Sequence, residues 1–158
     1  MKTAWYNSNS LPDSMLNSGF KPLGKSDHFE SLSNCFKMSK GEKLLDIGCG
    51  TGEVSKAFPN WEYTGADLPH IIQDVSQKSN PSAEYIAFDA NETNFEFVKQ
   101  YDVILMNSFL SEVPDWYLIL NKILLHATGD VLIHRQEITH SESHLDNYIT
   151  YGNLPTVK

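Results

Sequence analysis

Basic residues, cysteines and long apolar runs are all scarce in this sequence. The 158 residues include 12 lysines and arginines against 20 acidic residues, a formal net charge of −8. That balance disfavours tight binding to nucleic acid, because contacts with phosphates need clustered Lys and Arg side chains. No apolar run approaches the roughly 20 residues that cross a bilayer, so we expect no membrane-spanning segment.

The only cysteines are Cys35 and Cys49, and Cys49 sits among closely spaced glycines. We therefore expect no structural disulfide, which fits the reducing cytoplasm. Cysteines and histidines do not show the spacing of a zinc site, so we expect no metal. The N-terminal segment, Met1–Tyr6, lacks the apolar stretch of a signal peptide.

The most informative stretch is the nine-residue run LLDIGCGTG, from Leu44 to Gly52. An apolar run that stops at a glycine cluster predicts a buried strand ending in a tight turn, and a short helix follows over 53–58. Glycines let the backbone approach a ligand closely, and a helix N-terminus directs unpaired N–H groups at it. The pattern departs from the dinucleotide signature because Glu53 stands where its third glycine should be, and the phosphate-binding lysine of a P-loop is missing.

Strand and helix signals alternate along the rest of the chain. Further strands are predicted over 61–67, 84–88, 101–106 and 130–138. Helices are predicted over 27–38, 68–78, 94–99 and 113–124. This alternation predicts an α/β fold with a parallel sheet and helices on both faces.

Polar side chains follow successive predicted strands at the edge where such sheets bind ligands. They are Asp46, Asp67, Asp89 and Asn107. Asp67 stands 19 residues after Gly48, and a carboxylate at that separation accepts hydrogen bonds from both hydroxyls of a ribose. Asp67 is also suited to cap the following helix, and both roles stay open.

The run LLDIGCGTG resembles the first motif of class I S-adenosylmethionine-dependent methyltransferases, which commonly reads (L/V)LDxGCGTG. The resemblance implies a Rossmann-like, doubly wound and mainly parallel sheet of order 3-2-1-4-5, with S-adenosylmethionine as the cofactor. Asn107-Ser108-Phe109-Leu110 departs from the (N/D/S)PP(Y/F/W) motif of enzymes that methylate nucleic-acid amines, which favours a small-molecule acceptor. The alternative is an S-adenosylmethionine-binding module without catalytic activity of its own, acting as a partner or regulatory subunit.

The resemblance also implies a set of cofactor-binding residues. Asp46 would lie near the cationic amino-acid part of the cofactor or hold the glycine loop, Asp67 would bind the ribose, and Asp89 with Ala90 would bind the adenine. The whole set is Asp46, Gly48, Cys49, Gly50, Gly52, Asp67, Leu68, Asp89, Ala90 and Asn107.

No catalytic base can be carried over from the family, because its histidine after the fourth strand is replaced by Glu112 or is absent. The remaining candidates for a base lie in or after the fifth predicted strand: His134, Arg135, His140 and His144.

The two ends of the chain depart from the family pattern. Residues 1–25 form either a loosely ordered extension or a flap over the ligand, with Trp5 and Tyr6 as its apolar contacts, and residues 26–158 form one domain. Full family members have two more strands after the fifth. Here 154–157 could begin a sixth strand, but we expect no seventh. The fifth strand would then be an exposed edge, which predicts a possible homodimer.

Overall fold

The computed structural model describes residues 23–26, 28–91, 94–113, 115–140 and 143–149. The flap expected over residues 1–25, with Trp5 and Tyr6, falls almost entirely outside the described residues. Its last part, Leu23–Lys25, forms the short 3₁₀ helix η1, and Leu23 is buried.

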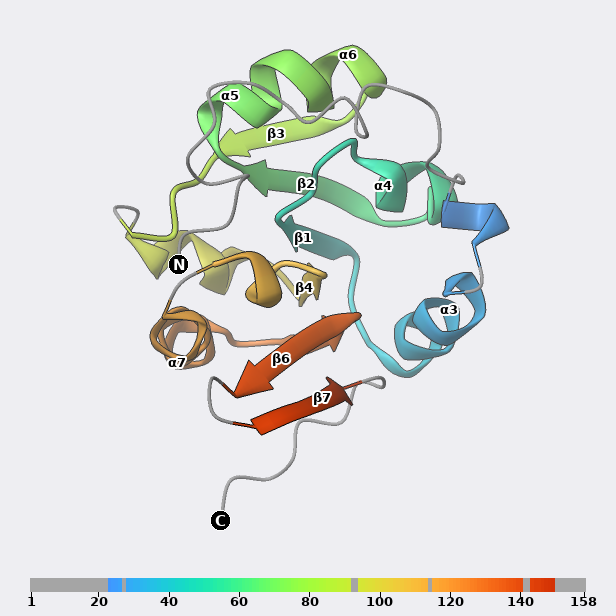
Figure 1. Cartoon of the computed structure of the whole chain (residues 1–158). Coiled ribbons are helices and arrows are strands. Elements are labelled where there is room, and N and C mark those ends of the chain that lie inside the picture. Colours follow the sequence, from blue (N-terminus) through green and yellow to red (C-terminus); the bar gives the residue numbers. More distant parts are fainter. Residues whose placement is uncertain (1–22, 27, 92–93, 114, 141–142, 150–158) are drawn as a thin grey trace.

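Five parallel strands form the central sheet, in the order β3-β2-β1-β4-β5. This order confirms the predicted Rossmann-like fold. In Figure 1 the strands from β3 to β4 run down the picture in that sequence. Their bounds are β1 Lys43–Ile47, β2 Glu62–Asp67, β3 Glu84–Ala87, β4 Val103–Asn107 and β5 Asp130–His134.

Helices cover both faces of the sheet, so its central strands are buried on both sides. One face carries α3 (Phe29–Met38) and α4 (Glu53–Ala57) with η1. The other carries η3 (Phe95–Gln100), η4 (Leu110–Glu112) and α7 (Trp116–His126). A further helical segment joins β2 to β3, consisting of α5 (Pro69–Ile71), the π-helical turn η2 (Ile72–Ser76) and α6 (Gln77–Ser79).

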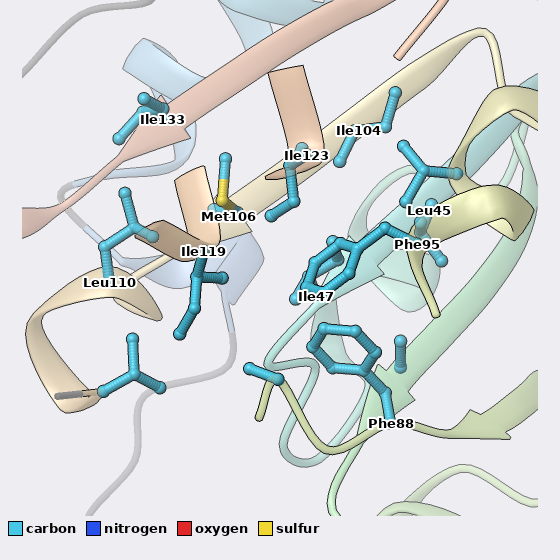
Figure 2. Packing of buried hydrophobic residues seen from close by; sticks show 14 residues of the cluster. Leu45, Ile47, Phe88, Phe95, Ile104, Met106, Leu110, Ile119, Ile123 and Ile133 are labelled. Carbon is cyan, nitrogen blue, oxygen red and sulfur yellow. The ribbon is translucent and has the colours of Figure 1, made fainter. Parts of the chain in front are cut away.

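Alternate residues of β1 and β4 point to opposite faces, because side chains along a strand alternate. Leu44 packs in the cluster with α3, whereas Leu45 and Ile47 pack in the cluster with α7. Figure 2 shows this second cluster, in which Ile123 of α7 lies close to Met106 of β4. The apolar contacts hold the carboxyl ends of the strands in fixed register.

The predicted strand over 130–138 is wrong in its second half. Arg135 adopts a left-handed backbone conformation, with φ of 53°, and this turns the chain out of β5. Residues beyond it form β6 (Gln136–His140) and β7 (Ser143–Ile149), an antiparallel pair separate from the main sheet. The chain thus has two strands after β5 where at most one was expected, although neither joins the main sheet, which keeps its five strands. The possible strand at 154–157 lies outside the described residues.

Other differences are smaller. The segment predicted over 94–99 forms the 3₁₀ helix η3, Phe95–Gln100, and the side chain of its N-cap residue Asn94 accepts a hydrogen bond from the N–H of Glu96. Within the described residues, β5 remains an outer strand of the five-stranded sheet, as expected.

Candidate functional site

A pocket of about 350 Å³ lies at the carboxyl ends of the parallel strands. Parallel α/β sheets bind ligands at this edge, where the order of the strands reverses. Eight of the ten predicted site residues line the pocket: Asp46, Gly48, Cys49, Gly50, Asp67, Leu68, Ala90 and Asn107. The structure thus brings together side chains from the ends of β1, β2 and β4 and from the loop after β3.

The glycine loop after β1 folds back onto the end of β2. The N–H groups of Gly48 and Cys49 donate to the carbonyl oxygen of Ala66, over 2.7 Å and 3.3 Å. Gly48 has φ of 78°, and a Cβ built there would lie 2.7 Å from the ring of Phe109. Glycine is therefore required at this position by both backbone conformation and space.

Asp67 fixes the same loop from the end of β2. Its carboxylate accepts hydrogen bonds from the N–H of Gly50, at 2.9 Å, and from the N–H of Leu68, at 2.8 Å. Burial raises the pKa of Asp67 above its ordinary value, and these two hydrogen bonds oppose the rise. The expected helix-capping role is not seen, because Leu68 is the N-cap residue of α5. The ribose role stays a prediction.

Asp46 is a carboxylate buried in the wall of the pocket, only 1% exposed. One oxygen, Oδ2, accepts a hydrogen bond of 2.9 Å from the hydroxyl of Tyr63. The other, Oδ1, has no hydrogen-bond partner among the residues that the structure describes. Burial raises the pKa of Asp46 to about 7, the Tyr63 hydrogen bond lowers it, and the charge of Asp67 raises it further. A buried acceptor without a partner in a pocket wall suits a ligand that brings a donor or a positive charge.

Two residues that hold the glycine loop were missed by sequence reasoning. Ser76, at the end of the π turn η2, donates a hydrogen bond of 2.5 Å from its hydroxyl to the carbonyl of Gly50. Asn80 donates from its amide to the carbonyl of Gly52, at 3.3 Å. Both are buried. The sequence offered one sign of their role: both are polar residues next to the apolar stripe of the helix predicted over 68–78.

Gly52 and Asp89 are the two predicted site residues that do not line the pocket. A Cβ at Gly52 would lie 2.5 Å from the hydroxyl oxygen of Tyr85, so this glycine allows close packing below the loop. Asp89 accepts hydrogen bonds at Oδ1 from the backbone N–H and the side-chain amide of Asn91. Phe88 lines the pocket beside Ala90 and was not predicted.

The opposite end of the pocket is formed by the ends of β4 and β5. Its lining includes Asn107, Ser108, Phe109, Glu112 and Arg135. The loop after β4 is held in a left-handed conformation at Ser108, with φ of 59°. Such backbone strain in a non-glycine residue is common at binding sites, where the surrounding structure fixes the conformation.

His134, a candidate base, lies behind this wall and does not line the pocket. Its Nδ1 is 3.0 Å from Oδ1 of Asn107, and its Nε2 is 2.6 Å from the hydroxyl of Ser31. Burial lowers its pKa to about 4, with the nearby His28 and Arg135 lowering it further. With both nitrogens engaged, His134 is placed to orient Asn107. The side chains of His140 and His144 lie outside the described residues.

Among the described helices, none combines the length and the apolar character needed to cross a bilayer. Within the same part of the chain, no group of three or more His, Cys, Asp or Glu side chains could hold a metal ion.

Residues 26–152 match the family described as Methyltransferase domain. The chain belongs to this family. The match covers the whole five-stranded sheet and the glycine loop, and it confirms the resemblance to class I S-adenosylmethionine-dependent methyltransferases. The sequence and the fold of this methyltransferase domain therefore both assign it to the same family.

Several curated relatives are similar over part of the chain. A ubiquinone biosynthesis O-methyltransferase of Pseudomonas savastanoi pv. phaseolicola is 36% identical over 81 residues, which cover 48% of this chain and 35% of the relative. One from Bordetella avium is 30% identical over 62% of this chain and 44% of the relative. A demethylmenaquinone methyltransferase of Staphylococcus aureus is 34% identical over 53% of this chain and 38% of the relative. The chain thus spans less than half the length of these relatives.

Solved structures show the same fold. The plantazolicin methyltransferase BpumL, in complex with a desmethyl substrate analogue and SAH, has a TM-score of 0.54 and 25% identity, over 75% of this chain and 47% of that one. The amino pentose methyltransferase CalS10 of Micromonospora echinaspora, solved with bound SAM, has a TM-score of 0.56 and 17% identity. That likeness covers 75% of this chain and 57% of CalS10.

Proposed function

We propose that this protein is an S-adenosylmethionine-dependent methyltransferase that acts on a small molecule. The observation that carries the proposal is the unpartnered oxygen of buried Asp46 in a pocket beside the glycine loop. S-Adenosylmethionine brings an ammonium group and a sulfonium, so its positive charge suits a buried carboxylate with one oxygen that no described residue hydrogen-bonds. The names of the curated relatives and the family match support the same function.

The order of the lining residues suits an extended cofactor. Asp46, Gly48 and Gly50 would hold its amino-acid part, and Asp67 would accept hydrogen bonds from the ribose hydroxyls. Ala90 and Phe88, which line the pocket on the β3 side, would contact the adenine. Leu68 would complete the apolar wall there. Asp89, whose Oδ1 accepts from the N–H of Asn91, would accept a hydrogen bond from the adenine amine.

When bound, S-adenosylmethionine supplies an electrophilic methyl group with a neutral thioether as leaving group. The task of the chain is then to orient the acceptor in line with that bond and to exclude water. Alignment of this kind contributes up to roughly 7–11 kcal/mol in favourable cases. Among the described lining residues at the acceptor end of the pocket, Glu112 is the carboxylate that would take a proton from an acceptor hydroxyl or amine.

Binding and transfer can be tested separately. We expect S-adenosylhomocysteine (SAH), the demethylated product, to bind in calorimetry. Gly50→Arg should abolish binding, because the new side chain fills the pocket beside Asp67. Gly24→Arg is the matched control, since a Cβ at Gly24 meets nothing within 4 Å.

Incubation with methyl-labelled S-adenosylmethionine and a small-molecule extract then tests transfer. Labelled products from the wild type, and none from Gly50→Arg, are expected. Binding without transfer to any acceptor would instead favour a cofactor-binding module. Failure of the wild type to bind SAH would overturn the proposal.

Three further features are part of this proposal. The outer strand β5 supports a homodimer that pairs through this edge, and sedimentation that finds a monomer at high concentration would remove it. The net charge of −8 supports an acceptor other than nucleic acid. Cys35 and Cys49 are both free thiols, which supports a cytoplasmic location, and fractionation of cells tests it.

A further inference from the structure

Arg135 is the single basic residue among the described residues that line the pocket. The other charged lining residues are acidic, namely Asp46, Glu53, Asp67 and Glu112. No ion pair joins Arg135 to another described side chain. A half-buried guanidinium in a pocket wall, with no carboxylate of the described part of the chain as partner, is suited to an anionic ligand.

The position of Arg135 separates it from the cofactor half of the pocket. It directly follows β5, whereas the glycine loop follows β1, and β4 lies between these strands. Neighbouring strands are about 4.8 Å apart, so Arg135 stands about 10 Å across the sheet from the glycine loop. Asp67 and Ala90 lie on the far side of that loop. An anion at Arg135 would therefore lie beyond the sulfonium, on the acceptor side.

A second donor lies next to Arg135. Asn107 is paired in register with His134, the residue that precedes Arg135. Because the amide oxygen of Asn107 can only accept, the contact of 3.0 Å requires the proton on Nδ1 of His134. Nε2 is then the acceptor in its 2.6 Å contact with the hydroxyl of Ser31, which also lies 3.2 Å from the carbonyl oxygen of His28. This chain of hydrogen bonds occupies the oxygen of Asn107 and leaves its NH₂ group as the donor for a ligand.

The backbone at Arg135 gives an independent indication. Its φ of 53° is a left-handed conformation that side chains rarely adopt, and glycine would fit it without strain. The strained residue is a long cation that lines the pocket, rather than a glycine. Such an outlier at a residue that lines the pocket supports a functional role for the side chain.

We infer that the acceptor of this methyltransferase carries a carboxylate or phosphate group, bound by the guanidinium of Arg135 together with the amide of Asn107. This inference rests on the proposed function and narrows its substrate class. His134 is a positioning residue in this arrangement, since it acts through Asn107. The anion serves as a handle that places another atom of the acceptor against the methyl group.

The test uses the full chain saturated with SAH and four probes: benzoate, phenyl phosphate, and their neutral counterparts benzamide and phenol. Calorimetry should show at least one anion binding tenfold or more tightly than its neutral counterpart. Arg135→Gln should reduce that ratio to within twofold of unity, while SAH affinity changes less than twofold. Arg135→Gly also removes the guanidinium but relieves the backbone strain, so it should fold well and show the same loss of anion preference. Lys37→Gln is the control for loss of an exposed charge.

Other results would exclude either the anion site or the proposed function. Equal binding of anions and neutral probes by the wild type would overturn the inference, although SAH binding would leave the proposed function standing. If Arg135→Gln weakens SAH tenfold but leaves 5′-methylthioadenosine unchanged, the anion is the carboxylate of the cofactor, and the acceptor need carry none. Absence of SAH binding in the wild type would instead remove the proposed function itself.

His134→Gln tests the positioning role. We expect it to reduce the anion preference tenfold, and Asn107→Ala to cause the same loss, with the preference measured at saturating SAH because Asn107 also belongs to the predicted cofactor set. If the double variant loses no more than either single variant, the two residues act as one unit. Full preference in both single variants would leave Arg135 as the sole anion ligand and would overturn the role of Asn107.

Discussion

At the scale of single residues, the protonation of Asp46 is the property with most influence on the site. Burial raises its pKa from the ordinary 3.8 to about 7, so the free protein carries a proton on Asp46 over much of the acidic range. The folded-state pKa lies above that of the unfolded chain. The free protein should therefore lose stability as pH rises from about 4 to about 7, where the buried carboxyl group ionises.

Ligand binding should show the opposite trend. An ammonium group beside Asp46 favours the carboxylate, so binding at low pH must first remove the proton. We expect SAH affinity to rise by up to about tenfold per pH unit below pH 7 and to level off above it. Calorimetry between pH 5.5 and 8, in buffers of different ionisation enthalpy, measures both the affinity and the proton released.

Asp46→Asn supplies the control for that experiment. The amide cannot ionise, so its SAH affinity should be weak and nearly flat across this range. A wild-type affinity that does not change between pH 5.5 and 8 would show that Asp46 is not in contact with the charged part of the ligand.

Asp67→Ala should act on the ligand and the loop together. Its carboxylate accepts from the N–H of Gly50, so the variant leaves this N–H without its partner as well as removing the predicted ribose contact. We expect SAH affinity to fall at least tenfold. Asp74→Ala is the matched control, because Asp74 is exposed and its ion pair with Lys78 lies on the surface. Calorimetry measures the SAH affinity of both variants. Equal affinities of Asp67→Ala and Asp74→Ala would contradict the role of Asp67.

At the scale of elements, the site depends on how firmly β1 and β4 are held by the helices that pack on them. Ile123 of α7 is fully buried in the cluster of Figure 2, whereas Leu125, two residues further, is 81% exposed. The same helix thus carries two side chains of nearly equal size, one buried and one exposed.

Ile123→Ala should lower the free energy of unfolding by about 2–5 kcal/mol, because it leaves a cavity under β4. Leu125→Ala should change it by less than about 0.5 kcal/mol. Urea denaturation measures both. Similar losses from the two variants would mean that the exposed face of α7 is covered in solution.

The junction of β5 and β6 gives a prediction with the opposite sign. Arg135→Gly should raise the free energy of unfolding by about 0.5–1 kcal/mol, since glycine accepts φ of 53° without a steric penalty. Arg135→Ala keeps the penalty and is the control. The change in the free energy of unfolding, measured by thermal and urea denaturation, should therefore differ in sign or size between the two variants. A loss in both would show that the guanidinium holds the fold together.

The elements also show what could be predicted from the sequence. The strand, loop and helix around Gly48 were predictable, because an apolar run next to closely spaced glycines is a strong local signal. The turn at Arg135 was not, because arginine has no preference for a left-handed conformation. The π turn that places Ser76 under the loop was equally hidden, since its helix shows ordinary apolar periodicity. The strands β6 and β7 contain too few apolar residues to signal pairing.

In the site, the residues of the glycine loop and the strand ends were predictable, whereas the side chains that hydrogen-bond to them were not. Asp46 and Asp67 follow from their positions at strand ends. The hydrogen bonds from Tyr63 to Asp46 and from His134 to Asn107 join residues far apart in the chain, and only the register of the sheet brings them together.

At the scale of the whole molecule, the ligand should stabilise the folded chain, because SAH is expected to bind the folded state and not the unfolded one. SAH at 100 times its dissociation constant should raise the free energy of unfolding by about 2.7 kcal/mol. Gly50→Arg should show no gain, whereas Gly24→Arg should match the wild type. Urea denaturation with and without SAH measures the difference. Unchanged unfolding of the wild type at saturating SAH would argue against binding to the folded state.

The pocket also has a simple relation to the order of the chain. Apart from Leu23, the lining residues fall in two stretches of the chain: 46–90, which would surround the methyl donor, and 107–135, which would surround the acceptor and holds one predicted cofactor residue, Asn107. A single exchange of coding sequence between codons 91 and 106 would therefore transfer the acceptor half intact to a new donor half. Homologous chains recombined in that interval would inherit substrate choice from one parent and methyl-donor binding from the other.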